Sequence, residues 1–161
     1  MIAMNVILLM ALAFNGLLSG MTLDQSVKQL PARHRIGVSA YSAYSRASDL
    51  GNGIAFYAVF GLAAPASAVA FAIAAYRTVG TNHPLFIPAL LAALFSASQL
   101  IFTAGAAPTN FSQRRYDLAD EAALTAVFDR FERFQTWRSV SVTLGFACLL
   151  WAAGVLLASL S

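Results

Sequence analysis

Arg138 is the residue whose type and position most directly suggest chemistry in this chain. It immediately precedes a segment, residues 139 to 161, that contains no charged residue. A guanidinium at the edge of an apolar segment either extends to a polar surface or turns inward and binds an anion. If Arg138 turns inward, its candidate partners in the chain are Asp24, Asp49 and Asp117. The alternative partner is an acidic or phenolate oxygen of a ligand.

Two carboxamide side chains, Asn15 and Gln99, interrupt apolar segments in which an unpaired polar group is costly. We expect them at similar depth in the molecule, where they either line a pocket or tie helices together by hydrogen bonds. Tyr41, Tyr44 and Trp137 lie near the same end and would flank such a pocket. Further polar residues at this depth are Asn52, Tyr57 and Thr103.

The two histidines do not predict a metal site. His34 and His83 each lack a nearby cysteine or second histidine, and we expect them at opposite ends of the molecule. His34 is either a loop residue that faces lipid headgroups or a general base, because imidazole titrates near neutral pH. Cys148 is the single cysteine, so the sequence predicts no disulfide or thiol pair within the chain.

The distribution of charge predicts the elements that position these residues. Only 11% of the 161 residues are charged and 59% are hydrophobic, whereas a soluble domain has about 25% charged residues. Residues 1 to 23, 50 to 76, 78 to 113 and 139 to 161 contain no charge. Each segment is long enough for the roughly 20 helical residues that cross a bilayer core of about 30 Å.

The sequence therefore predicts an all-α polytopic membrane protein: an antiparallel bundle of four transmembrane helices with cytoplasmic helical extensions. A single domain covers residues 1–161, with spans at about 3–23, 52–76, 84–107 and 137–159. The apolar N-terminal stretch lacks a preceding basic region, so we expect it to be the first span and not a signal peptide.

Local signals place further boundaries in the second half of the chain. The Thr81–Pro84 stretch predicts the start of the third span, and Pro108 predicts its end. Asn110 and Gln113 have the spacing of a capping box. An apolar stripe on one helical face then predicts a cytoplasmic amphipathic helix over about 111–135 that leads into the fourth span.

Basic residues predict the orientation. Nine of the 10 lysines and arginines, and all seven acids, lie in residues 24–49 and 114–138. Because cytoplasmic loops of membrane proteins are enriched in Lys and Arg, these two segments are expected in the cytoplasm and both termini outside. No free basic stripe with interleaved aromatic residues is present, which argues against nucleic acid as a partner.

Several short motifs occur in an order that resembles a known family. They are Gly16 to Gly20, Tyr41-Tyr44-Arg46-Asp49, Pro108-Thr109-Asn110 and Trp137-Arg138. In order and spacing over nearly the whole chain, they resemble the anthrone-oxygenase-like family of small four-helix membrane proteins. Some characterised members are taken to oxidise anthrone polyketides to anthraquinones with O2 and without an evident cofactor. Relatives often have a histidine upstream of the fourth-span arginine, where this chain has Gln135.

The resemblance implies an oxidoreductase that acts on a hydrophobic phenolic or quinone-type molecule in the cytoplasmic half of the bundle. Arg138 would stabilise the substrate anion, and His34 or Asp49 would remove its proton. Asn110 and Gln99 would orient oxygen atoms. No cofactor is assigned, and a haem or quinone at a subunit interface stays open as an alternative.

A second interpretation is a non-enzymatic accessory or assembly subunit of a larger membrane complex. Gly16 and Gly20 have the small-xxx-small spacing that lets another helix approach closely, in a homo-oligomer or a larger complex. This interpretation predicts co-purification with other chains, whereas the first predicts a bound aromatic molecule. Membrane lipid is a partner in both.

Overall fold

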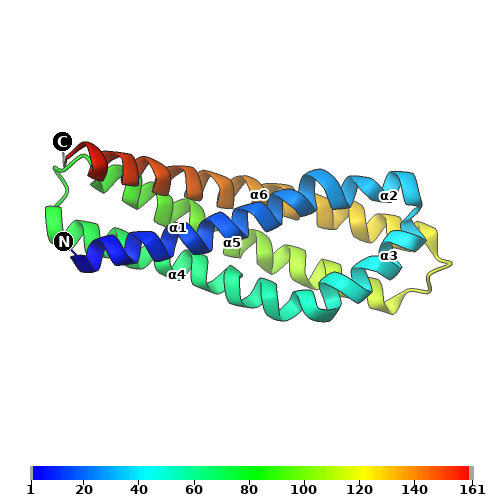
Figure 1. The fold of residues 1–161 in the computed structure, drawn as a ribbon. Coiled ribbons are helices and arrows are strands. Elements are labelled where there is room, and N and C mark those ends of the chain that lie inside the picture. Colours follow the sequence, from blue (N-terminus) through cyan, green and yellow to red (C-terminus); the bar gives the residue numbers. More distant parts are fainter. Residues whose placement is uncertain (1, 160–161) are drawn as a thin grey trace.

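A computed structural model describes residues 2–159, which are helical apart from short connections and contain no strand. Four long helical rods lie side by side (Figure 1). The first rod comprises α1 (Ile2–Leu23), a π-helical turn η1 (Asp24–Gln29) and α2 (Leu30–Ile36). The second comprises α3 (Val38–Ala47), a second π-helical turn η2 (Ser48–Asn52) and α4 (Gly53–Val79). The third is α5 (Phe86–Ser112) with the 3-10 turn η3 (Gln113–Arg115), and the fourth is α6 (Glu121–Ala158).

All four rods are long and apolar enough to cross a membrane. Each contains an 18-residue stretch with a mean hydropathy of 1.8 to 2.2. The rods have 35, 42, 30 and 38 residues, so each is longer than the roughly 20 residues that a bilayer core requires. These findings confirm the prediction of an all-helical chain with four helices of membrane-spanning length.

The two ends of the bundle differ in composition. The described ends of the chain and the α4–α5 turn lie at one end, while α2, α3 and the α5–α6 connection lie at the other (Figure 1). The second end carries the two charge-rich segments, residues 24–49 and 114–138. The bundle therefore has an apolar half and a charged half.

The boundary between the third and fourth rods differs from the expectation. Pro108 lies inside α5, which continues to Ser112, and Gln113 Nε2 donates to Asn110 Oδ1 at 2.6 Å within that helix end. The next helix begins at Glu121, where the Asp120 side chain accepts a hydrogen bond from Ala123 N at 3.1 Å. The predicted amphipathic stretch is thus part of α6, continuous with the fourth apolar segment.

In the apolar half, small residues let the helices approach closely. A Cβ atom at Gly145 of α6 would lie 3.1 Å from Ser96 N and 3.5 Å from Ala92 O of α5. At Gly16 of α1, a Cβ atom would lie 3.0 Å from the Phe146 ring. Gly16 therefore packs against its own chain, whereas a Cβ atom at Gly20 would have nothing within 4 Å.

Two buried carboxamides tie these helices together. Asn15 Nδ2 donates to Ala64 O of α4 at 3.0 Å, and Asn15 Oδ1 accepts from Ser96 Oγ of α5 at 2.6 Å. Gln99 Nε2 donates to Gly61 O at 2.7 Å. Pro65, four residues beyond Gly61, has no N–H to donate to that carbonyl. Gln99 therefore supplies the hydrogen bond that the proline removes from α4.

A buried arginine holds the charged half together. Arg33 of α2 is 5% exposed and donates to Asp129 and Glu132 of α6, each at 2.7 Å. Arg133, four residues after Asp129 on α6, has the spacing of a helical ion pair, but Asp129 binds Arg33 in the structure. Next to this contact, Tyr41 packs edge-on against Phe128, with 4.9 Å between ring centroids.

Candidate functional site

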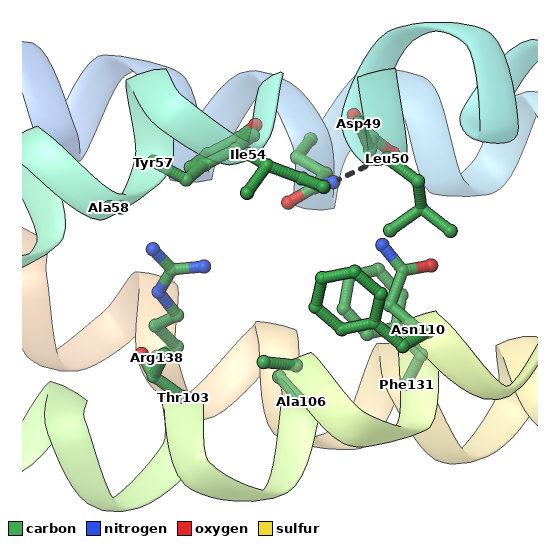
Figure 2. A pocket seen from close by; sticks show the side chains of 13 residues that line it. Asp49, Leu50, Ile54, Tyr57, Ala58, Thr103, Ala106, Asn110, Phe131 and Arg138 are labelled. Carbon is green, nitrogen blue, oxygen red and sulfur yellow. Dashed lines mark hydrogen bonds between the residues drawn. The ribbon is translucent and has the colours of Figure 1, made fainter. Parts of the chain in front are cut away.

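A cavity of about 240 Å³ lies between the four rods, at the junction of the apolar and charged halves (Figure 2). Every rod contributes to its wall. The lining residues are Gln25, Asp49, Leu50, Ile54, Tyr57, Ala58, Thr103, Ala106, Ala107, Asn110, Phe111, Phe131 and Arg138. Ile54 of α4 and Phe111 of α5 are 39% and 40% exposed, so the cavity reaches the surface between these two helices.

Both π-helical turns contribute to the cavity. Gln25 comes from η1, and Asp49 and Leu50 come from η2. Gln25 Nε2 donates to Asp49 Oδ2 at 3.3 Å and so joins the two turns. Within η2, the backbone at Gly51 leaves the helical region, with φ −94° and ψ −115°. Arg114 Nη2 donates to the Leu50 carbonyl there, at 2.5 Å. Single π-turns inside α-helices are frequent at functional sites.

Arg138 faces the cavity from α6 (Figure 2). It is 6% exposed, and its Nε is buried without a hydrogen-bond partner in the described chain. Its Nη1 donates to Gln135 Oε1 at 3.5 Å, and the guanidinium carbon lies 5.4 Å from the Tyr57 ring centroid. Within residues 2–159, no carboxylate forms an ion pair with Arg138.

The three acids that the sequence offered as partners of Arg138 have other contacts. Asp24 pairs with Lys28. Asp117 accepts a hydrogen bond from Ala119 N at 2.8 Å in the α5–α6 connection. Asp49 shares the cavity with Arg138 but does not reach it. Arg138 has therefore turned inward without a protein counter-ion in the described chain.

Asp49 is a second charged group in the cavity wall, and it is 8% exposed. Its Oδ2 accepts from Ser45 Oγ at 2.9 Å as well as from Gln25. Arg46, three residues earlier in the chain, does not pair with Asp49 but donates to Gln113 O at 2.5 Å and Tyr116 O at 2.8 Å. Asp49 is thus hydrogen-bonded but, in the described part of the chain, not paired with a cation.

Asn110 is another strongly buried polar group of the wall, 7% exposed. Its Oδ1 accepts from Gln113 Nε2, so its Nδ2 is left to donate. Figure 2 shows the amide pointing into the cavity from α5, near Leu50 and on the Asp49 side. The remaining wall is largely apolar, with Ile54 and Phe131 as large hydrophobic members.

The structure brings three of the nine sequence-predicted site residues together, and these are Arg138, Asp49 and Asn110. The other six lie outside the cavity wall. Asn15 and Gln99 form the helix ties described above. His34 is exposed on α2, Tyr41 is buried against Phe128, and Tyr44 is half exposed. Trp137 is 61% exposed and lies on a surface groove with Arg130 and Arg133.

Tyr57 and Thr103, which the sequence placed at the depth of the expected pocket, line the cavity, whereas Gln25 and Phe131 are wall residues that the sequence did not single out. Gln25 carried one usable signal, because it stands two residues beyond the first charge-free segment, and Asp49 and Arg138 likewise border the second and the fourth. Phe131 lies within the amphipathic helix predicted over about 111–135 and carried no signal of a cavity. No group of three or more His, Cys, Asp or Glu side chains suited to a metal ion occurs among residues 2–159.

Comparisons of the chain with protein-family models, with curated proteins and with solved structures find no match.

Proposed function

We propose that this chain is an integral membrane protein that binds an acidic, apolar aromatic molecule in its interior cavity and oxidises it with O2. The observation that carries the proposal is Arg138, a buried guanidinium that faces the cavity without a carboxylate partner in the described chain. The oxidation step draws on the resemblance to the anthrone-oxygenase-like family. The binding step draws on the cavity itself.

Burial of the Arg138 cation has an energetic cost. Removing a charged group from water without a counter-ion costs several kcal/mol (about 3–5 when a buried pair is broken). The Tyr57 ring at 5.4 Å offsets part of this cost. An anionic oxygen in the cavity would accept charge-assisted hydrogen bonds from Nε and from a terminal nitrogen. Arg138 therefore favours a ligand with an acidic oxygen.

The rest of the wall selects for an apolar ring. Leu50, Ile54 and Phe131 supply hydrophobic surface, and Tyr57 adds an aromatic face. Ligand pockets usually enclose about 300–1,000 Å³, so a cavity of about 240 Å³ suits one or two rings. Further rings of a larger substrate would extend outward between Ile54 and Phe111, where the cavity reaches the surface.

Asp49 is the base in this scheme, because it lies in the cavity wall and His34 is exposed on α2. Asp49 takes a proton from an acidic CH₂ group conjugated to a ring carbonyl, and Arg138 stabilises the oxygen of the resulting enolate. The enolate reduces O2. Two C–H bonds break, the carbon gains a C=O bond to one oxygen atom, and the other oxygen leaves as water. The balance is CH₂ plus O2 to C=O plus H₂O, with no further reductant.

We also propose that the charged end of the bundle faces the cytoplasm. Nine of the 10 basic residues lie in the two segments at that end, and the positive-inside rule relates such an excess to the cytoplasmic side. The cavity then lies near the inner boundary of the membrane, where an amphiphilic aromatic molecule partitions.

The test is O2 uptake by the purified protein in mild detergent with anthrone as the substrate. We expect one O2 consumed per anthrone at a rate well above that of empty micelles. Arg138→Gln should lose at least 100-fold of the catalysed rate, since oxyanion-type stabilisation is worth about 10²–10³. Arg130→Gln, which changes an exposed arginine outside the cavity, is the matched control and should keep the rate.

Equal rates in wild type and Arg138→Gln would contradict the scheme. The accessory-subunit interpretation makes a different prediction, in which foreign chains co-purify in fixed stoichiometry and anthrone is not turned over. The Gly16 to Gly20 motif on which that interpretation depends is partly covered within the bundle, because Gly16 packs against Phe146 of the same chain.

A further inference from the structure

We infer that the ligand of this cavity carries two oxygen functions at opposite ends of an aromatic ring. An acidic oxygen binds Arg138, and a hydroxyl group binds between Asp49 and Asn110. The inference rests on the proposed binding function and specifies its ligand class.

The polar groups of the cavity are placed at two separate ends. Figure 2 shows the Arg138 guanidinium and Tyr57 at one side of the cavity, and Asp49 and Asn110 at the other. Arg138 and Asp49 form no ion pair, although both line the same cavity. The space between the two polar ends is bordered by apolar side chains that include Ala106. A bound molecule therefore meets a polar group at each end and apolar surface between them.

The hydrogen-bonding capacity at the Asp49 end selects the functional group that binds there. An ionised carboxylate only accepts hydrogen bonds, and a carboxamide nitrogen only donates them. Asp49 Oδ2 accepts from Ser45 Oγ and Gln25 Nε2, and such hydrogen bonds favour the ionised carboxylate, so Asp49 is an acceptor. Asn110 Nδ2 is a donor with no partner in residues 2–159. A hydroxyl group donates to one and accepts from the other. An amine satisfies Asp49 alone, an ether satisfies Asn110 alone, and a bare ring satisfies neither.

The Asp49 end is held in place before a ligand arrives. Ser45 Oγ donates to Asp49 Oδ2 at 2.9 Å and accepts from Gln113 Nε2 at 3.2 Å. The same Gln113 nitrogen donates to Asn110 Oδ1 at 2.6 Å, and Gln113 Oε1 accepts from Ser42 Oγ at 3.0 Å. Gln113 is 0% exposed. The network couples Asp49 of η2 to Asn110 of α5, which preorganises the donor and acceptor that face the ligand.

The test compares four small anions for binding to the full chain in phosphatidylcholine nanodiscs, by equilibrium dialysis against empty nanodiscs. The probes are benzoate, 4-hydroxybenzoate, 4-aminobenzoate and 4-methoxybenzoate. Because a hydrogen bond to a charged group is worth about 1.5–3 kcal/mol, 4-hydroxybenzoate should bind at least about 10-fold more tightly than benzoate. 4-Aminobenzoate should lie between them, and 4-methoxybenzoate should bind more weakly than 4-hydroxybenzoate.

Variants separate the two ends of the site. Asp49→Asn, which is nearly isosteric, should reduce the preference for 4-hydroxybenzoate over benzoate to about 1 to 3-fold. Benzoate itself should bind at least as tightly as in wild type, because the substitution removes a negative charge from the cavity that holds the anion. Retained benzoate binding also reports that the variant is folded. Arg138→Gln should weaken both anions at least about 10-fold and keep the preference. Asp117→Asn, which changes an exposed aspartate of the α5–α6 connection, is the control and should change nothing.

Suppose that wild type binds benzoate and 4-hydroxybenzoate with equal affinity and that Arg138→Gln binds neither. This result would overturn the hydroxyl contact with Asp49 and Asn110 and leave the Arg138 site intact. A preference that persists in Asp49→Asn would also overturn it. Failure of every anion to bind would overturn the proposed function together with this inference.

Discussion

At the scale of single residues, Arg138 has a cost in stability and, in the proposed function, the role of binding an anion. Its guanidinium is 6% exposed and has no counter-ion in the described chain, so its burial costs free energy that the fold must supply. Groups of this kind are retained at functional sites although an apolar residue of similar volume would be more stable. The sequence identified Arg138, because a cation at the edge of a charge-free segment has few environments available.

Replacing Arg138 with methionine should therefore stabilise the protein while abolishing anion binding. We expect the free energy of unfolding to rise by about 1–3 kcal/mol, because the buried charge is removed and the side-chain volume is nearly kept. Unfolding in mixed micelles with increasing sodium dodecyl sulfate measures the change. Arg130→Met at an exposed position should shift stability by less than about 0.5 kcal/mol. A stability loss at Arg138 equal to that of a broken ion pair would show that the arginine has a partner after all.

Gln99 shows what the sequence left undecided at this scale. A buried amide in an apolar helix fits a pocket and a helix tie equally well until its acceptor is known. Its acceptor is Gly61 O at 2.7 Å, the carbonyl that Pro65 leaves without a helical donor. The pairing joins residues on different helices, and a single sequence gives no means of aligning their depths to within one turn.

A double-variant cycle tests this pairing. Gln99→Leu should destabilise the protein by about 1–2 kcal/mol, because it leaves Gly61 O unsatisfied in an apolar environment. In a Pro65→Ala background the restored N–H serves Gly61 O, so the cost of Gln99→Leu should fall by at least about 0.5 kcal/mol. Ser98→Ala, whose hydroxyl bonds only Phe95 O of its own helix at 2.8 Å, is the control. Additive effects of the two substitutions would argue against the assignment.

At the scale of elements, the four helical segments followed from the charge-free windows, because a span of apolar residues has few alternatives. The helix ends and the π-helical turns could not be predicted from these windows. Pro108 was expected to end the third span, but it lies inside α5. The two π-helical turns, η1 and η2, have no sequence signature that distinguishes them from α-helix, yet they supply three residues to the cavity wall.

Close packing of α5 on α6 gives a prediction at the element scale. Gly145→Leu should destabilise the protein by about 3 kcal/mol or prevent folding, since even a Cβ atom would lie 3.1 Å from the Ser96 backbone nitrogen. Gly154→Leu on the same helix is the matched variant, because a Cβ atom at Gly154 would have nothing within 4 Å. We expect Gly154→Leu to be neutral or stabilising by up to about 1 kcal/mol. Similar losses at both sites would contradict the close approach of the two helices.

At the scale of the whole molecule, charge asymmetry is the feature with the clearest consequence. The segments that contain nine of the 10 basic residues lie at one end of the bundle, together with the α5–α6 connection. Length and hydropathy establish which helices can cross a bilayer. They do not distinguish the two directions of crossing, which is why the orientation is a prediction from loop charge.

Cysteine labelling tests the orientation. In a Cys148→Ser background, Ala119→Cys and Asn82→Cys place single thiols at exposed positions at opposite ends of the bundle. A membrane-impermeant maleimide added to intact cells should label Asn82→Cys and not Ala119→Cys, and inverted vesicles should show the reverse. The opposite pattern would place the charged end outside. Labelling of both thiols from one side would contradict a four-span topology.

The central claim is that Arg138 holds an anionic aromatic molecule in the cavity between the four rods. Photolabelling with 4-azidobenzoate, followed by peptide mass spectrometry, tests it most directly. We expect labels within residues 50–58 and 103–111, competition by benzoate, and loss of labelling in Arg138→Gln. Labels confined to the surface groove around Arg130 and Trp137, and unchanged in Arg138→Gln, would contradict it.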